Sequence, residues 1–162
     1  MAIAKQKIVP FLWFDTQAED AVQFYLSVFE SGQVTATTRY GPEGPGAAGS
    51  VMTIAFELEG QQFVGLNGGP NFKFNEAVSF VVNCETQQEI DHYWGALTAD
   101  GGQPIQCGWL KDKYGLAWQI VPVVFWELIQ SSDAARVSRV MQAMMQMQKF
   151  DIAALERAAA EQ

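Results

Sequence analysis

The chain has 162 residues, of which 49% are hydrophobic, and it carries a formal net charge of −8. This length fits one domain or two small fused modules, and the acidic charge repels phosphate backbones, which argues against a nucleic-acid partner. No apolar run reaches the roughly 18 residues that a membrane span requires, and the N-terminus lacks the apolar stretch of a signal peptide. We therefore expect a cytoplasmic protein in which Cys84 and Cys107 are free thiols.

The first half of the chain predicts a βαβββ unit. Residues 8–14 are apolar and aromatic and indicate a strand, and Asp15 and Thr16 behind it are suitable helix caps. Apolar residues then recur at helical spacing from Ala18 to Phe29. Three further strands are predicted, at residues 34–40, 51–59 and 63–66, and the middle one alternates between apolar and polar positions.

The second half repeats this order. A strand is predicted at residues 77–82 and a helix at about 86–99, and strands follow near 103–110 and 116–125. The tail from Asp133 is helical in pattern, with a stripe of methionine and valine, and Asp151 can cap a last short helix. The expected fold class is α+β, with modules at 1–75 and 76–126 and a C-terminal helical extension at 127–162.

A duplicated unit of this kind has a structural consequence, because neither copy can bury its sheet face alone. Two copies side by side would form one curved sheet with a cleft, and such a cleft is the default site for a ligand. An alternative is that assembly is the main role and no ligand binds. The shared sheet predicts that a fragment of residues 1–75 does not fold by itself.

The glycine-rich segment from Gly44 to Gly49 matches the spacing of a dinucleotide-binding loop, but its context does not fit. Such a loop works when backbone N–H groups point at a pyrophosphate from a helix N-terminus. Here the segment leads into a predicted strand, and Pro42 and Pro45 remove two N–H donors. We interpret it as a loop between strands that could also cover a cleft.

Metal-ligating residues are sparse. A metal site needs several His, Cys, Asp or Glu side chains at one point, and His92 is the single histidine of the sequence. Glu57 and Glu59 share a strand face and could form a carboxylate pair, although solvated edge charges are the more ordinary interpretation. We therefore expect neither a metal nor another cofactor.

Polar residues inside apolar strands are the best candidates for binding a ligand, because such a group must be hydrogen-bonded or face a cavity. Gln119 and Ser79 have this placement, and Asn67 is a third candidate, although asparagine beside two glycines is also typical of turns. A satisfied core or interface glutamine remains the alternative for Gln119. The aromatic side chains that could form the walls of the site are Trp13, Trp109, Tyr114 and Trp118.

Several segments together resemble the PhnB-like branch of the vicinal oxygen chelate superfamily, which also contains glyoxalase and bleomycin-binding proteins. They cover nearly the whole chain in the expected order, and they are Val9–Asp15, Phe24–Tyr25, Gly60–Pro70, Phe80–Glu85, Tyr93–Trp94, Trp109–Pro122 and Ala143–Met147. The resemblance implies two βαβββ modules in an incomplete eight-stranded barrel and a homodimer that often exchanges modules. Many members of this branch carry the label demethylubiquinone methyltransferase-like.

The resemblance also indicates where metal-dependent members place their ligands. The corresponding positions are Pro10, Ser79, Gln119 and, with an uncertain register, Asn67. None of these residues supplies a carboxylate or an imidazole, so the resemblance favours a metal-independent protein here. The leading hypothesis is a dimeric binder of a small organic ligand. The alternative is an enzyme, either a methyltransferase-like transferase or a metal-dependent lyase or dioxygenase.

Overall fold

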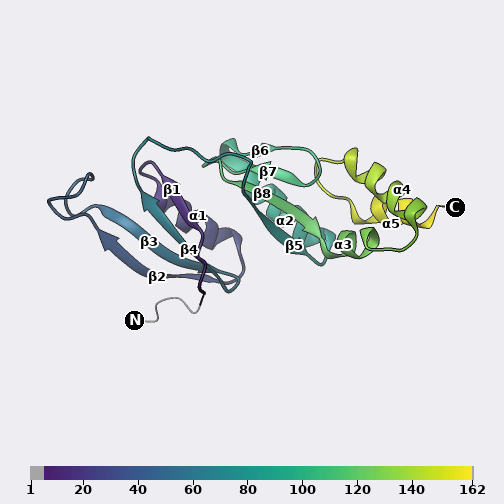
Figure 1. Cartoon of the computed structure of the whole chain (residues 1–162), viewed down its shortest axis with the longest axis horizontal. Coiled ribbons are helices and arrows are strands. Elements are labelled where there is room, and N and C mark those ends of the chain that lie inside the picture. The colour runs from purple at the N-terminus through teal and green to yellow at the C-terminus, as the bar shows by residue number, and fades with distance from the viewer. Residues whose placement is uncertain (1–5, 162) are drawn as a thin grey trace. The chain divides into compact units, whose positions relative to one another are not determined.

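The structure is a computed structural model that describes residues 6–161, and its elements are labelled in Figure 1. The chain divides into two compact units, Met1–Phe74 and Asn75–Gln162. Each unit contains one four-stranded sheet. The described residues contain no helix that is both long and apolar enough to cross a bilayer.

The first unit has the predicted βαβββ order. Its strand order is β1-β4-β3-β2, with β1 and β4 parallel and the other pairs antiparallel. In the sequence, β1 precedes α1, and β4 follows the hairpin of β2 and β3. The elements are β1 (Phe11–Phe14), α1 (Ala18–Val28), β2 (Gly32–Arg39), β3 (Val51–Leu58) and β4 (Gln61–Asn67).

The core of the first unit lies between α1 and one face of its sheet. The alternation in β3 buries Ile54, Phe56 and Leu58, as its pattern predicts. The Phe56 ring stacks on Tyr25 of α1 at 6.3 Å between centroids. Burying each of these large apolar side chains stabilises the fold by about 1.5–3 kcal/mol.

The start of α1 differs from the prediction. The N-cap is Gln17, and neither Asp15 nor Thr16 caps the helix. The Oδ1 atom of Asn67, at the end of β4, instead accepts a hydrogen bond of 2.8 Å from the Ala18 N–H. The prediction was wrong because it considered only residues adjacent to the helix, whereas an exposed backbone N–H can be satisfied from any part of the fold.

The second unit repeats the topology, with strand order β5-β8-β7-β6 and a parallel β5–β8 pair. The predicted α+β fold class with two βαβββ modules is therefore confirmed. The elements are β5 (Ser79–Cys84), α2 (Gln87–Thr98), the 3₁₀ turn η1 (Ala99–Gly101), β6 (Gln103–Pro104), β7 (Trp109–Lys111) and β8 (Ala117–Pro122).

Two predicted strands of the second unit are shorter than expected. The strand predicted at residues 103–110 is split into β6 and β7, because Cys107 and Gly108 both have positive φ angles, of 60° and 80°. A strand cannot continue through two left-handed residues. The strand predicted at 116–125 ends at Pro122, and the next residues form a helix. Their apolar pattern is compatible with either structure in so short a run.

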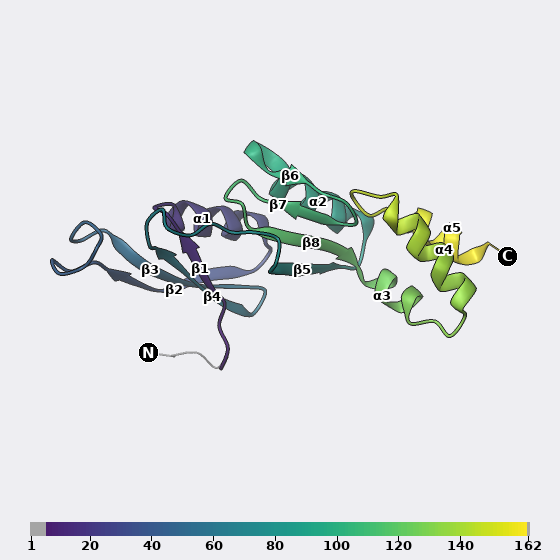
Figure 2. The ribbon, with the colours of Figure 1, turned by 45° about the horizontal axis from the view of Figure 1, so that its top comes forward.

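Three helices form the C-terminal extension, α3 (Val123–Ile129), α4 (Ala134–Met145) and α5 (Ile152–Ala160). Asp133 and Asp151 cap α4 and α5 by accepting hydrogen bonds from backbone N–H groups. Val140 belongs to the stripe of methionine and valine residues on α4, and it is fully buried. The views in Figures 1 and 2 both place α4 beside α5.

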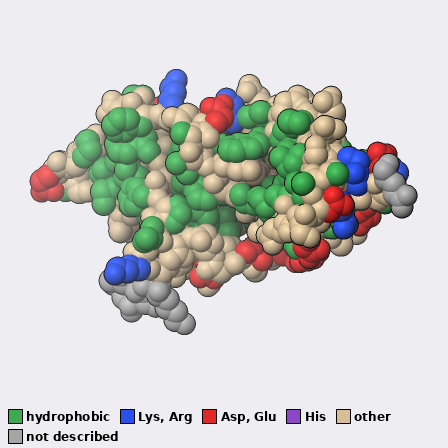
Figure 3. Space-filling view, turned by 45° about the vertical axis from the view of Figure 1, so that its right-hand side comes forward, with side chains coloured by type: hydrophobic (Ala, Val, Ile, Leu, Met, Phe, Trp, Pro, Cys, Tyr) green, Lys and Arg blue, Asp and Glu red, His purple; other side chains and the backbone are tan. Residues whose placement is uncertain are grey.

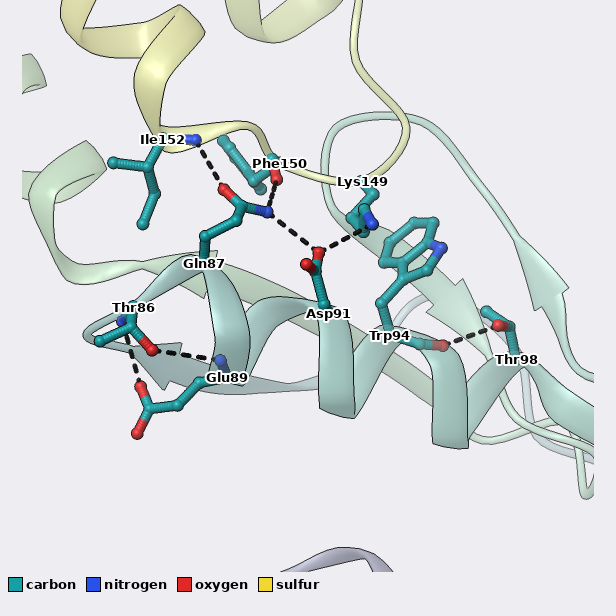
Figure 4. Close-up of polar contacts among 9 residues, drawn as sticks. All are labelled: Thr86, Gln87, Glu89, Asp91, Trp94, Thr98, Lys149, Phe150 and Ile152. Carbon is teal, nitrogen blue, oxygen red and sulfur yellow. Dashed lines mark hydrogen bonds and ion pairs between the residues drawn. The ribbon is translucent and has the colours of Figure 1, made fainter.

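The extension is attached to the second unit by a short segment between α4 and α5. Its Met147 and Gln148 carbonyls accept hydrogen bonds from the N–H groups of Cys107 and Gly108. Figure 4 shows that Gln87 of α2 bonds the same segment, donating to the Phe150 carbonyl and accepting from the Ile152 N–H, both at 2.9 Å. Helices from Val123 onward are thus an integral part of this unit.

Candidate functional site

One face of the second sheet carries the most notable group of polar side chains. The opposite face packs against α2 and buries Leu110, Trp118 and Ile120. Because side chains alternate along a strand, the residues between these point away from α2. We call this side the open face of the second sheet. The strand register places on it Ser79, Val81, Asn83, Trp109, Lys111, Ala117, Gln119 and Val121. Two of these residues, Ala117 and Val121, are buried.

The centre of the open face is the pair Gln119 and Ser79. The Gln119 Nε2 atom donates a hydrogen bond of 2.9 Å to Ser79 Oγ, from β8 to β5. This bond satisfies one amide hydrogen, and the Gln119 Oε1 atom and the Ser79 hydroxyl hydrogen stay available to a further partner. The two residues are both half-buried. The Gln119 Oε1 atom, a hydrogen-bond acceptor, and the Ser79 hydroxyl group, a donor, therefore lie side by side in a mostly apolar surface.

The neighbours of Gln119 supply an aromatic and an aliphatic surface. Trp109 on β7 and Val81 on β5 are its direct partners in the sheet register. Val81 is 42% exposed, which is high for a valine in a strand. Stacking on the Trp109 indole suits a flat ring, and Gln119 and Ser79 can orient polar atoms on that ring.

The charge at the rim of this face is balanced. The Lys111 ammonium forms an ion pair of 2.9 Å with Glu76, just before β5. The hydrogen bond from Lys111 lowers the pKa of Glu76. The pair is exposed, so it contributes little to stability, but it leaves the rim without a net charge near Ser79.

The sequence analysis missed Asn83 on this face and Trp126 of α3, which bonds to it. Asn83 continues the row that begins with Ser79 and Val81, and its Oδ1 atom accepts a hydrogen bond of 2.9 Å from the Trp126 indole N–H. A polar residue at two-residue spacing from Ser79 was a usable signal in the sequence. Trp126 could not be found in this way, because it lies one residue beyond the strand predicted at 116–125 and reaches this face only through α3.

Two of the predicted aromatic residues lie away from Gln119. Trp118 is buried on the α2 side, and its indole N–H donates a hydrogen bond of 2.9 Å to Asp112 Oδ2. Asp112 is itself buried and also accepts from the N–H groups of Tyr114 and Leu116. Tyr114 belongs to the turn between β7 and β8. Asp112 and Trp118 therefore fix the hairpin that presents Trp109 and Gln119.

The remaining predicted residues, Trp13 and Asn67, lie in the first unit. The amide of Asn67 is fully used, since it accepts from Ala18 and donates to Glu19 Oε2 and to the Val51 carbonyl, at 2.7 and 3.1 Å. These bonds hold it on the α1 side of the sheet. The Trp13 indole N–H donates to the Gly69 carbonyl, and the ring lies so close to Gly68 that a side chain there would clash.

A pocket of about 390 Å³ opens beside Asn67. It is lined by the turn before α1, by part of the 41–50 loop and by Asn67–Gly69. The loop joins β2 to β3, as predicted, and its Gly44 and Gly46 pack closely on the Tyr40 ring. Tyr40 in turn donates a hydrogen bond of 2.5 Å to the Asn67 carbonyl. The glycines thus let the loop cover Tyr40.

The donor atoms present do not suit a divalent metal. Within residues 6–161 no group of three or more His, Cys, Asp or Glu side chains is placed to hold one. The positions indicated by the superfamily resemblance hold Pro10, Ser79, Gln119 and Asn67, and Asn67 is already fully hydrogen-bonded. A glycine-rich strand-to-helix turn for a nucleotide-like methyl donor does not fit either, because the 41–50 loop joins two strands.

Comparisons with known proteins support one family. The family described as 3-demethylubiquinone-9 3-methyltransferase matches residues 6–121. The PhnB protein of Bacillus cereus is 38% identical over 73% of this chain and all of its own, with a TM-score of 0.66. A Pseudomonas aeruginosa protein is 20% identical over 73% of this chain and 98% of its own, with a TM-score of 0.59.

A more distant structure shares only the fold. The fosfomycin resistance protein FosX of Listeria monocytogenes, solved with Mn(II) and sulfate, is 10% identical over 79% of this chain and 98% of its own. Its TM-score is 0.54. No protein with a curated description matches the sequence. The family match ends at residue 121, so the C-terminal helices lie beyond it.

Proposed function

This chain belongs to the 3-demethylubiquinone-9 3-methyltransferase family, and we propose that it is a metal-independent, dimeric protein that binds a flat aromatic small molecule. The ligand lies on the open face of the second sheet. Trp109 stacks on its ring, and Gln119 and Ser79 bond a hydroxyl or carbonyl group on the ring. A cytoplasmic location belongs to the same proposal and is supported by the free thiols of Cys84 and Cys107.

The observation that carries the proposal is the Gln119–Ser79 hydrogen bond. It holds the Gln119 amide in one orientation between Trp109 and Val81. Within residues 6–161 no hydrogen bond is made to its Oε1 atom. A half-buried amide oxygen of this kind can still accept a hydrogen bond from a ligand on the open face. A phenolic ligand supplies the missing partner, because its O–H can donate to Gln119 and its oxygen can accept from Ser79.

Metal independence is proposed from the chemistry of the donors. Amide and hydroxyl oxygens without a carboxylate bind divalent ions weakly, and the residues at the expected positions offer nothing stronger. Covalent catalysis by Cys84 has no support either, because burial raises the pKa of its thiol to about 12. At neutral pH this thiol is protonated and not nucleophilic.

The dimer is proposed from exposed apolar side chains, which reach the surface over wide areas in Figure 3. Phe11 is 59% exposed in the first unit, and Val78 is 66% exposed in the second. Apolar groups of this size are commonly covered in an assembly. Light scattering behind a sizing column should give about twice the chain mass of 17.9 kDa. A monomer at micromolar concentration would remove this part of the proposal.

The ligand is tested by titrating the protein with 2-naphthol, a flat phenol, and measuring the dissociation constant by calorimetry. We expect Gln119→Ala to weaken binding by about tenfold, since a hydrogen bond to the half-buried Gln119 amide is lost. Gln88→Ala on the exposed side of α2 is the matched control and should leave affinity unchanged. Equal affinities for the wild type and Gln119→Ala would place the ligand elsewhere.

The second candidate function is a methyltransferase-like transferase, which is favoured by the name of the matching family. It requires a site for S-adenosylmethionine, and no glycine-rich turn between a strand and a helix is present in residues 6–161. Calorimetry with S-adenosylmethionine distinguishes the two candidates. Saturable binding with a 1:1 stoichiometry would favour the transferase, and no heat of binding would favour the binder.

A further inference from the structure

The first helix of the C-terminal extension brings a tryptophan to the open face of the second sheet. Trp126 belongs to α3, which begins directly after β8 at Val123. Its indole N–H is bonded to Asn83 at the end of the row that starts with Ser79 and Val81. In Figure 2, α3 lies just beyond the ends of β5 and β8. The matching family region ends at residue 121, so this residue lies outside the shared part.

Trp126 is not one of the buried residues of α3, although its ring lies 5.5 Å from that of Phe125 between centroids. The buried residues of the helix are Phe125 and Leu128, and the Phe125 ring packs on Phe150 with 5.1 Å between centroids. The Trp126 side chain is 36% exposed. A large indole that is left accessible, yet held in a fixed direction by Asn83, is the arrangement expected of a contact residue.

The spacing along β5 sets the size of ligand that could use this indole. Val81 is the register partner of Gln119, and Asn83 lies two residues further, or about 7 Å along the strand. A ligand whose polar group is bonded at Gln119 must extend by about that distance to meet the Trp126 ring. Two fused rings satisfy this requirement better than one ring does.

We propose that Trp126, positioned by Asn83, is a specificity-determining residue that selects fused bicyclic aromatic ligands over single-ring ligands. The inference rests on the proposed function, because it assumes a ligand held at Gln119 and Ser79. It adds that the C-terminal extension shapes the ligand site as well as completing the second unit. The energetic basis is stacking of the second ring on the indole.

The test compares 2-naphthol with phenol, which differ by the second ring. Dissociation constants are measured for the wild type, Trp126→Ala and Asn83→Ala. We expect Trp126→Ala to weaken 2-naphthol binding by about tenfold and phenol binding by less than about twofold. Asn83→Ala removes the hydrogen bond that orients the Trp126 indole but leaves the ring in place. It should weaken 2-naphthol binding by about threefold. A purely structural role would weaken both ligands equally and would overturn the inference.

A spectroscopic measurement on the wild type guards against a variant that fails to fold. The indole N–H signals are recorded by ¹H–¹⁵N NMR, and the Trp126 signal is assigned by its absence in Trp126→Phe. Addition of 2-naphthol should move the Trp126 and Trp109 signals and leave that of Trp94, on α2, in place. A moved Trp109 signal with a stationary Trp126 signal contradicts the inference alone. If neither signal moves, the proposed function fails as well.

Discussion

The two modules share a topology but satisfy the start of their helices in different ways. In the first, the N-terminus of α1 is capped from a distant strand by Asn67, whose amide is then fully occupied. In the second, α2 is capped locally by Thr86 and Glu89, which bond each other's backbone N–H groups. This capping box is visible in Figure 4. Gln119, in the last strand of the second module, lies on the face that points away from α2, and its amide is bonded to Ser79 of the neighbouring strand instead of to a helix.

The largest effect on stability is expected from Asn67→Ala. The substitution removes three hydrogen bonds that join β4, α1 and β3, and one of them involves the Glu19 carboxylate. We expect the free energy of unfolding to fall by about 3 kcal/mol. Urea denaturation followed by circular dichroism measures it. Asn71→Ala, in the exposed connector, is the control, and a loss of less than about 1 kcal/mol for Asn67→Ala would refute the remote cap.

A smaller effect is expected from the local cap. Thr86→Ala removes the side-chain bond to the Glu89 N–H and should reduce the free energy of unfolding by about 1 kcal/mol. Thr16→Ala at the start of the first helix is the matched variant and should have almost no effect, because Thr16 does not cap α1. Equal losses for the two variants, measured in the same denaturation experiment, would mean that the two helices begin in the same way.

These cases show how far the sequence determines the fold. The alternation of β3, the spacing of α1 and the start of α2 near Thr86 were predicted from local patterns. The capping box itself was not predicted, although Thr86 and Glu89 are three residues apart as such a box requires. The role of Asn67 depends on a contact between residues 49 positions apart, for which no local pattern exists. The first turn of α3 was predicted as the end of a strand, because the short apolar run from Val123 to Phe125 suits either structure.

The candidate site was predictable to a similar extent. Gln119 and Ser79 were found because each is polar in an apolar strand, and the structure brings them into contact. Trp118 and Trp109 could not be separated without knowing which face of the sheet α2 covers. The position of Trp126 at the open face depends on the helix α3 and on the hydrogen bond to Asn83. Neither can be predicted from a local sequence pattern.

The smallest effect concerns the ion pair between α2 and the C-terminal segment. The hydrogen bond from Lys149 is the main cause of the lowered pKa of Asp91. A carboxyl group with a lowered pKa in the folded state adds stability above its ordinary pKa, and this stability is lost as the pH falls through the lowered value. The pair is largely exposed, so Lys149→Gln should cost no more than about 0.5 kcal/mol at pH 7.

The titration of Asp91 tests this interaction directly. Its carboxyl resonance, followed by NMR between neutral and acidic pH, should titrate at a higher pH in Lys149→Gln than in the wild type. Lys113→Gln is the control, because the Lys113 ammonium lies beside Asp100 at 4.0 Å and not beside Asp91. An unchanged Asp91 titration in Lys149→Gln would show that the ion pair does not form in solution.

The most direct test of the account is the titration of 2-naphthol in the presence of a metal chelator, because the central claim is that neutral side chains bind the ligand. Protein purified and titrated in excess EDTA should bind 2-naphthol with the same affinity as untreated protein, and Gln119→Ala should bind it about tenfold more weakly in both conditions. Loss of binding in EDTA and its recovery on addition of Mn²⁺ would contradict the account.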